Sequence, residues 1–132
     1  MNRFTVFIIL LLISSVTGAE GTTPYTAVKN AKGVQEIVMT AKSYSFSPDR
    51  VIVQVGVAVE LKIKKSGWTP HTFIIDDPAS GLDIKEKLSS SKDTLIKFTP
   101  EQKGEFAFYC GKKLPFGKSH REKGMHGLLG VR

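Results

Sequence analysis

The chain has 132 residues, with 19 Lys and Arg against 12 Asp and Glu, and its net charge is +7 at pH 7. This length is enough for one domain with a single core and too short for two. The lone cysteine, Cys110, excludes a disulfide within the chain. The basic charge comes without a basic helix or a recognisable base-stacking motif, which argues against a nucleic-acid partner.

Residues 1–19 predict a secretory signal peptide. Arg3 precedes an apolar run over residues 4–13, and small side chains follow up to Ala19. The run is about half the roughly 20 residues that span a bilayer. We therefore expect cleavage near Ala19, a periplasmic or otherwise exported protein, and no stable membrane insertion of the mature chain. An uncleaved segment that acts as a tether is the alternative.

Residues 20–33 lack apolar periodicity and are interpreted as a flexible lead-in to a single domain over residues 34–132. Short segments rich in β-branched and aromatic residues, separated by Gly, Pro and Asp turns, predict strands in that domain. They are residues 34–40, 44–48, 51–55, 57–64, 73–75, 94–98, 105–109 and 127–131. Residues 80–93 are mostly polar and predict a long loop or one helical turn. The pattern favours an all-β sandwich of seven or eight strands.

Four side chains in this sequence form a metal-ligand set. Cys110 is followed by His120 and Met125 with the spacing C-x9-H-x4-M, and His71 lies upstream. A soft thiolate, two imidazoles and a weak thioether suit a trigonal copper with a long axial bond. An exposed free thiol would be oxidised outside the cytoplasm, whereas a metal-bound, shielded thiolate is protected. Residues 111–125 connect the strand that ends at Cys110 to the last strand, so one loop carries three of the four ligands.

The residues around these ligands resemble the copper-binding end of the cupredoxins, the family of plastocyanins and azurins. The resemblance covers most of residues 34–132, and it is carried by residues 47–49, 53–56, 70–74, 106–110, 120 and 124–127. It implies a Greek-key β-sandwich and a type 1 copper site that cycles between Cu+ and Cu2+. It also implies that His71, Cys110 and His120 are the equatorial ligands and Met125 is the axial one.

Two departures from the family pattern leave questions open. The nine residues between Cys110 and His120 exceed the spacing usual in plastocyanin-like and azurin-like proteins. They come closer to the copper domain of two-domain nitrite reductases, so the subfamily stays open. Thr72 stands where many cupredoxins have asparagine. A hydrogen bond to the Cys110 sulfur must then come from the Thr72 hydroxyl, its backbone or another residue.

His126, Trp68 and Phe116 also lie near the ligands in the sequence. His126 adjoins Met125, and neighbouring side chains of an extended segment point to opposite faces, so only one of the two can face the metal. The family position favours Met125, which leaves His126 facing solvent. Trp68 and Phe116 flank the ligand regions. Either they cover His71 and His120, or they belong to the ordinary packing of the core.

Several other site chemistries are disfavoured. Methionine and the lack of closely spaced Cys or His pairs argue against zinc. A binuclear copper centre would need a second thiolate in the same loop. We find neither the base and oxyanion loop of a hydrolase nor a Gly-rich phosphate loop.

The expected function is a monomeric carrier of single electrons rather than an enzyme. Copper buffering or delivery is one alternative, and a catalytic variant with room for a small substrate beside the 111–119 loop is another. Residues 110–126 contain five cations against Glu122 alone, namely Lys112, Lys113, Lys118, Arg121 and Lys123. A positive rim of this kind would attract an acidic redox partner such as a c-type cytochrome or a membrane oxidase. Ordinary solvated loop charge is the competing interpretation.

Overall fold

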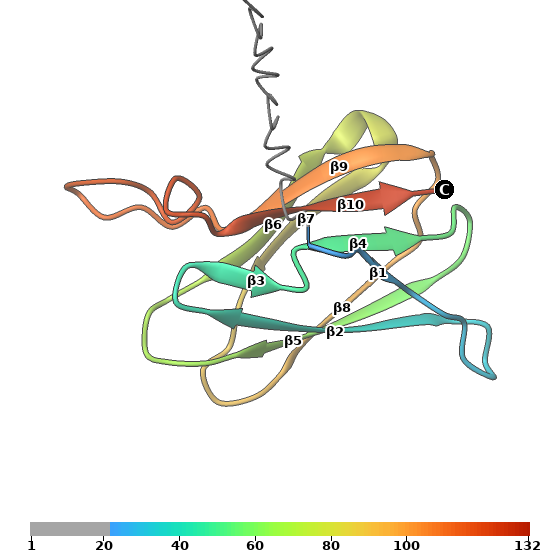
Figure 1. Ribbon diagram of the computed structural model, residues 1–132, viewed down its shortest axis with the longest axis horizontal. Helices are drawn as coiled ribbons and strands as arrows, with labels where there is room; N and C mark the ends of the chain where they lie inside the picture. The colour runs from blue at the N-terminus through green and yellow to red at the C-terminus, as the bar shows by residue number, and fades with distance from the viewer. Residues whose placement is uncertain (1–21) are drawn as a thin grey trace, which may run out of the picture.

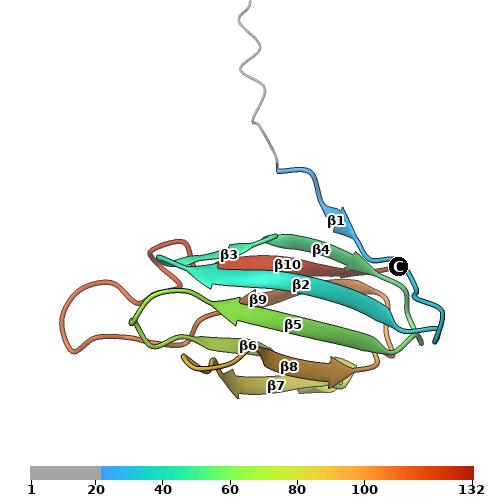
Figure 2. The same cartoon turned by 90° about the horizontal axis from the view of Figure 1, so that it is seen from below.

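The computed structural model describes residues 22–132, and the predicted signal peptide lies outside these described residues. Two β-sheets pack face to face as a sandwich (Figures 1 and 2). The larger sheet contains, in spatial order, β1 (Tyr25–Thr26), β4 (Arg50–Val53), β10 (His126–Val131), β9 (Gly104–Tyr109), β6 (Thr72–Asp77) and β7 (Leu82–Lys87). The smaller sheet contains β3 (Ser45–Ser47), β2 (Gln35–Lys42), β5 (Val59–Lys65) and β8 (Thr94–Phe98). The 3-10 turn η1 (Pro78–Ser80) joins β6 to β7.

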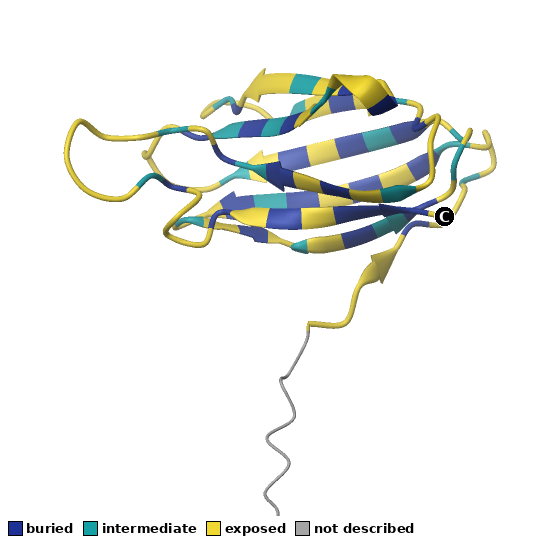
Figure 3. Ribbon diagram, turned by 90° about the horizontal axis from the view of Figure 1, so that it is seen from above, coloured by how far each residue is buried: buried dark blue, intermediate teal, exposed yellow. Residues whose placement is uncertain are grey.

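The core forms because buried and exposed side chains alternate along the strands, as Figure 3 shows. In β2 and β5 the inward positions hold Ile37, Met39, Leu61 and Ile63, each at most 3% exposed. Alternation with period two lets each strand bury one face against the opposite sheet while its other face meets water. The apolar interior between the sheets is therefore continuous along the sandwich.

Three phenylalanines tie the two sheets together beneath one end of the sandwich. Phe73 and Phe108 stack with their ring centroids 5.2 Å apart. Phe46 of the smaller sheet meets them edge-on, at 5.7 and 5.5 Å. Such pairs add about 0.5–1.5 kcal/mol each beyond burial of their area. His71 lies two residues from Phe73, and Cys110 lies two residues from Phe108. Because side chains alternate along an extended chain, both point to the same interior side as these rings.

The pairing of the strands places the ends of several elements together. β9 runs antiparallel to both β10 and β6, with Tyr109 opposite His126 and opposite Ile74. The end of β9 therefore lies beside the beginning of β10 and close to the beginning of β6. The segments that carry the four predicted ligands leave or enter the sandwich at this one end.

The prediction of an all-β sandwich is confirmed, and each of the eight predicted segments overlaps a strand. The described residues contain ten strands, so the predicted number of seven or eight is too low. The two additional strands, β1 and β7, lie at the edges of the larger sheet. An edge strand has a neighbour on one side alone, so it needs less apolar surface and leaves a weaker sequence pattern.

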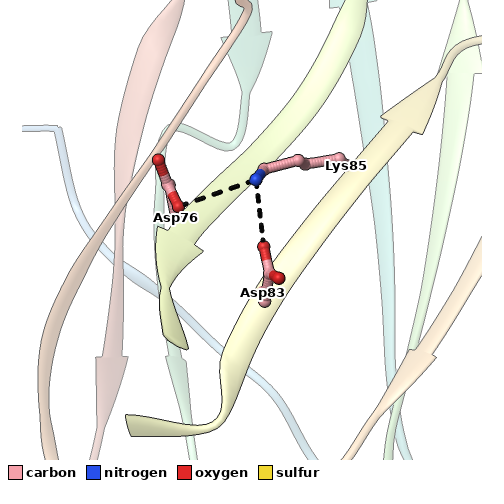
Figure 4. A network of polar contacts seen from close by, with 3 residues as sticks. All are labelled: Asp76, Asp83 and Lys85. Atoms are coloured by element: carbon pink, nitrogen blue, oxygen red, sulfur yellow. Dashed lines mark ion pairs between the residues drawn. The ribbon is translucent and has the colours of Figure 1, made fainter. Parts of the chain in front are cut away.

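β7 occupies part of the segment that was expected to be a loop or a helical turn. Its pattern is weak because Leu82 is its one buried residue. Asp76 and Asp83 are directly opposite in the β6–β7 pair, an arrangement that is destabilising for like charges. Lys85 lies 3.9 Å from Asp76 and 3.4 Å from Asp83 (Figure 4). The hydrogen bond and charge of Asp83, then the charge of Asp76, raise the pKa of Lys85, and this shared cation offsets the repulsion.

β1 lies in the segment that was expected to be a flexible lead-in. Tyr25 and Thr26 pair in parallel with β4, and the Ala27 N–H donates to the Ile52 carbonyl at 2.9 Å. Ordered pairing therefore begins before residue 34. A two-residue strand is too short to produce a periodic pattern, so the sequence offered no signal for it. Within residues 22–132 no helix has the length and apolar character needed to cross a bilayer.

Candidate metal centre

The four predicted ligands lie at one end of the sandwich, and all are buried. His71 immediately precedes β6, Cys110 follows β9 and Met125 precedes β10, while His120 lies in the connection between β9 and β10. Their exposed fractions are 2%, 0%, 0% and 3% for His71, Cys110, Met125 and His120. Three of these positions are set by strand ends, so the sheet holds them without help from a metal.

Three donor atoms converge into a small triangle. The Nδ1 atoms of His71 and His120 are 3.3 Å apart, and the Cys110 Sγ lies 3.9 Å from the first and 3.5 Å from the second. A point equidistant from all three lies about 2 Å from each, close to the ~2.0–2.3 Å bonds that nitrogen and sulfur make to a first-row metal. Among residues 22–132 no other group of three His, Cys, Asp or Glu side chains is arranged in this way.

The sulfur of Cys110 is held by Thr72. The Thr72 backbone N–H donates to Cys110 Sγ at 3.3 Å, and the Thr72 hydroxyl lies 3.7 Å from the same sulfur. The hydroxyl oxygen also accepts the Gly111 N–H at 2.9 Å. The question left open by the missing asparagine is therefore answered, because Thr72 supplies both a backbone and a side-chain contact. Donors aimed at a sulfur fix its orientation.

The connection between β9 and β10 is fixed by main-chain hydrogen bonds where it carries ligands. The Cys110 N–H donates to the Met125 carbonyl and the Met125 N–H to the His120 carbonyl, both at 3.0 Å. The His120 N–H donates to the Lys112 carbonyl at 2.9 Å. Beside them, the Ser119 hydroxyl and N–H each donate to the Glu122 carboxylate at 2.7 Å. These bonds from Ser119 lower the pKa of Glu122 and close the turn that carries His120.

The comparison with family models agrees with this geometry. A model described as the cupredoxin-like domain matches residues 4–123. The chain belongs to this family. No curated protein matches the chain in sequence. His71, Cys110 and His120 of this cupredoxin are positioned to bind a single copper ion, since two imidazoles and a thiolate at these distances form a trigonal copper-ligand set.

Solved structures with the same fold include several copper proteins. A mutant plastocyanin of fern is 27% identical, with a TM-score of 0.54 over 73% of this chain and 100% of that one. The metal-binding domain of the Cu(I)-exporting P-type ATPase CopA of Streptococcus pneumoniae is 20% identical, with a TM-score of 0.66 over 85% and 98%. Auracyanin A, a blue copper protein of Chloroflexus aurantiacus, is 18% identical, with a TM-score of 0.57 over 76% and 100%.

Tyr44 is a site residue that the sequence analysis missed. Its ring meets the His120 ring edge-on at a centroid distance of 4.8 Å and the His71 ring at 6.3 Å. Lys123 lies over the Tyr44 ring, 4.3 Å from its centroid. Ser43 and Tyr44 have φ of 45° and 64°, a left-handed conformation that is costly for a bulky residue. The turn between β2 and β3 thus brings an aromatic wall from the smaller sheet to both imidazoles.

Burial and nearby cations keep both imidazoles uncharged near neutral pH. Desolvation, followed by the charges of His120 and Lys65, lowers the pKa of His71 to about 4. Desolvation, followed by the charges of Lys123 and Lys112, lowers the pKa of His120. A metal ligand must present a free lone pair, so these shifts favour metal binding over protonation.

Met125 and His126 point in different directions. Met125 is fully buried, whereas His126 begins β10 as an exposed residue. The prediction that His126 faces solvent is confirmed. That Met125 supplies an axial thioether stays a prediction, supported by its burial and its main-chain bonds to His120 and Cys110.

The two interpretations of Trp68 and Phe116 are both wrong. Trp68 is 97% exposed and Phe116 is 91% exposed. Neither side chain packs into the core, and side chains this exposed cannot shield His71 or His120. The connection between β9 and β10 extends beyond the end of the sandwich (Figures 1 and 2), so an aromatic residue far along it has no core to enter.

Proposed function

We propose that this cupredoxin is an exported type 1 copper protein that carries single electrons between redox partners. The observation that carries the proposal is the buried triangle of His71, Cys110 and His120, set at the end of a rigid sandwich. Copper supplies a one-electron change between Cu+ and Cu2+. A donor set held by strands and hydrogen bonds stays nearly the same in both states, and a small structural change favours rapid electron transfer.

Each ligand has its own part in this proposal. His71 and Cys110 are the rigid donors because each adjoins a strand, and Thr72 restrains the sulfur. Met125 supplies a weak axial thioether, the ligand that tunes the potential of trigonal copper sites. His120 is the donor nearest the outside. Its side chain lines a surface pocket together with Tyr44, Thr69, Pro70, Lys112, Lys113 and Leu114.

The surroundings support a carrier that docks through this end. Structures of the fern plastocyanin include oxidised and reduced forms, and the likeness to that protein is consistent with a one-electron carrier. A partner that covers the pocket would approach the site through His120. The lysines that line the same pocket favour an acidic partner, such as a c-type cytochrome or a membrane oxidase. A periplasmic or otherwise exported location follows from the predicted signal peptide.

The decisive experiment is the visible and electron paramagnetic resonance spectrum of residues 20–132 after addition of copper(II), followed by reduction and reoxidation. We expect an intense thiolate-to-copper band and a narrow copper hyperfine splitting that disappear on reduction and return on reoxidation. A weak band with a wide splitting would contradict the type 1 assignment.

Copper buffering or delivery is the second candidate. The pocket beside His120 favours it, because an acceptor's ligand could enter there and displace one donor. Rapid transfer of Cu(I) to a chelating acceptor of similar affinity would support delivery, whereas reversible redox with slow copper exchange supports the carrier. Azide added to the copper(II) form addresses a catalytic variant, since a new azide-to-copper band would show a position open to a substrate.

A further inference from the structure

Two loops of this protein carry the same short pattern. Lys64 and Lys65 precede Trp68, and Lys112 and Lys113 precede Phe116, so in each loop an aromatic residue follows the second lysine at the third position. Both aromatic side chains stand almost free in solvent, at 97% and 91% exposed. A single exposed apolar residue is ordinary, but two nearly free large aromatics beside lysine pairs need a partner to explain them.

The two loops line the same surface pocket. The pocket beside His120 is lined by Thr69 and Pro70 of the first loop and by Lys112, Lys113 and Leu114 of the second. Leu114 is itself 55% exposed. The loops after β5 and after β9 leave the sandwich at the same end in both ribbon views (Figures 1 and 2). We call residues 64–70 and 111–118 the lysine–aromatic loops, although Lys64 and Lys65 are the last two residues of β5.

Within the described residues, no lysine of these loops is in an ion pair, although Glu122 lies close enough for the charges of Lys113 and Lys118 to lower its pKa. The ion pairs there involve Lys85, Lys97 and Arg132, and none involves a lysine of the lysine–aromatic loops. One of these lysines, Lys65, instead donates to the Gly67 carbonyl at 2.6 Å and to the Ser90 hydroxyl at 3.1 Å, contacts that leave its charge in place. The loops contain no acidic residue. They therefore present five lysines and two aromatics to whatever approaches this end.

We propose that the lysine–aromatic loops are a peripheral binding site for an anionic phospholipid surface. Trp68 and Phe116 enter the headgroup region, where aromatic residues gather at membrane–water boundaries. The lysines contact lipid phosphates, and each lysine near such a surface strengthens binding roughly fivefold. The bilayer adapts its shape to two separate protruding rings, so no preformed partner pocket is required.

We infer a lipid rather than a protein partner because the cations of these loops are lysines and not arginines. Interfaces between proteins are enriched in Arg and aromatics and depleted in Lys. The cations of the lysine–aromatic loops are all Lys. The nearby Arg121 is engaged elsewhere, because its guanidinium lies 4.1 Å from the centroid of the Tyr109 ring. These lysines can attract an acidic redox protein from a distance. For direct contact, flexible hydrated lysines suit a charged lipid surface better than a close-packed protein interface.

This binding site goes beyond the proposed electron transfer. Docking by these loops turns the end that contains His120 toward the membrane, where a membrane-embedded redox partner would lie. The lipid contact needs no copper, so it can be measured on the metal-free protein. Failure of lipid binding is therefore distinguishable from failure of the copper assignment.

The experiment uses the metal-free chain from Glu20 to Arg132, which contains every element that the structure describes. Trp68 is the single tryptophan, so its fluorescence reports on the first loop directly. With vesicles of phosphatidylcholine and phosphatidylglycerol at low salt, we expect a blue-shifted emission and protection from aqueous iodide. With pure phosphatidylcholine vesicles we expect neither change, and raising the salt to 1 M should reverse most of the effect.

Cosedimentation of variants with the same anionic vesicles separates the contributions. Trp68→Ser with Phe116→Ser should lower binding at least tenfold, and Lys112→Gln with Lys113→Gln about 25-fold. The matched control is Val38→Ser with Leu95→Ser, two side chains that are 55% and 50% exposed on the smaller sheet, and it should bind as the parent does. The far-ultraviolet circular dichroism spectrum and the urea unfolding curve of each metal-free variant report that the fold is retained.

Three outcomes would overturn the proposal. One is an unchanged Trp68 emission in the presence of anionic vesicles. Another is equal loss of binding in the control variant. In the third, an acidic redox protein shifts the Trp68 emission at a lower concentration than the anionic vesicles do, which would make the loops a protein interface instead.

Discussion

The connection between β9 and β10 contains two stretches with opposite properties. Residues 119–125 are closed by main-chain hydrogen bonds and place His120 and Met125 in the interior. Residues 111–118 extend from the sandwich and expose Leu114 and Phe116. The difference shows that the unusual length of this connection does not loosen the ligand set. The additional residues instead form a surface beside it, so chemistry and docking can be altered separately.

The largest effect should come from Cys110→Ser, at the centre of the buried stretch. A serine hydroxyl cannot replace the thiolate, so we expect the intense colour of the copper(II) protein to disappear. Visible absorption after copper addition checks this. Phe116→Ser in the exposed stretch is the matched control and should leave the band unchanged. If Cys110→Ser retained the colour, the ligand assignment would fail.

Lowering the pH should strongly reduce the stability of the metal-free protein. The unfolded chain binds a proton on His71 near pH 6.5, whereas the folded protein does so at about pH 4 because the ring is buried. The unfolded state therefore holds more protons between these values, and stability falls as pH drops through this window, by up to about 3 kcal/mol.

Urea unfolding at pH 7.5, 5.5 and 4 measures this fall. His71→Gln should reduce the pH dependence, and His120, whose pKa burial also lowers, should account for part of what remains. His126→Gln, at an exposed position of β10, should not alter it. Equal behaviour of the two variants would show that acid acts through other groups.

An intermediate effect is expected from Met125→Leu. The change keeps the buried volume nearly constant and removes only the weak thioether, so copper and colour should remain while the reduction potential shifts. Protein-film voltammetry measures that shift, with His126→Ala as the comparison. If Met125→Leu leaves the reduction potential unchanged and His126→Ala alters the copper spectrum, His126 rather than Met125 is the axial ligand.

A smaller effect should come from Thr72→Val, which keeps the N–H contact to Cys110 and removes the hydroxyl. Loss of one donor near the thiolate should lower the potential by on the order of 40 mV, equivalent to about 1 kcal/mol. Thr72→Ser retains the hydroxyl and should restore most of that difference. A potential equal to the parent's in Thr72→Val would show that the backbone N–H alone restrains the sulfur.

The smallest effect tests whether the exposed aromatic residues of both lysine–aromatic loops are independent of the buried donor set. Trp68→Ser with Phe116→Ser should leave the hyperfine splitting and the potential of the copper site within experimental error, because neither ring is positioned to shield the ligands. Electron paramagnetic resonance and voltammetry provide the measurement. A changed splitting would show that the exposed loops influence the geometry of the donor set.

Much of this protein could be predicted from residue types and spacing. Eight strands followed from short runs of alternating or β-branched residues, because the pattern of a half-buried strand is local. The donors His71, Cys110 and His120 followed from their chemistry and order, and the structure brings them within 4.8 Å of one another. The opposite directions of Met125 and His126 followed from the period of an extended chain.

Other features depended on contacts between segments far apart in the sequence. β1 and β7 are recognisable as strands only through their neighbours in the larger sheet, since edge pairing demands little apolar surface. Tyr44 comes from a turn of the opposite sheet, and no local pattern could place its ring against the imidazoles.

The same reason explains Thr72 and the exposed aromatics. Residue type indicated that Thr72 could donate a hydrogen bond, but the approach of β6 to the end of β9 decided that both its N–H and its hydroxyl meet the sulfur. Trp68 and Phe116 are residue types that are often buried in a core. They lie beyond the ends of the strands, however, where no core surrounds them. Local chemistry determined which side chains could bind the metal, while the long-range packing of the two sheets decided which residues support it and which face the surroundings.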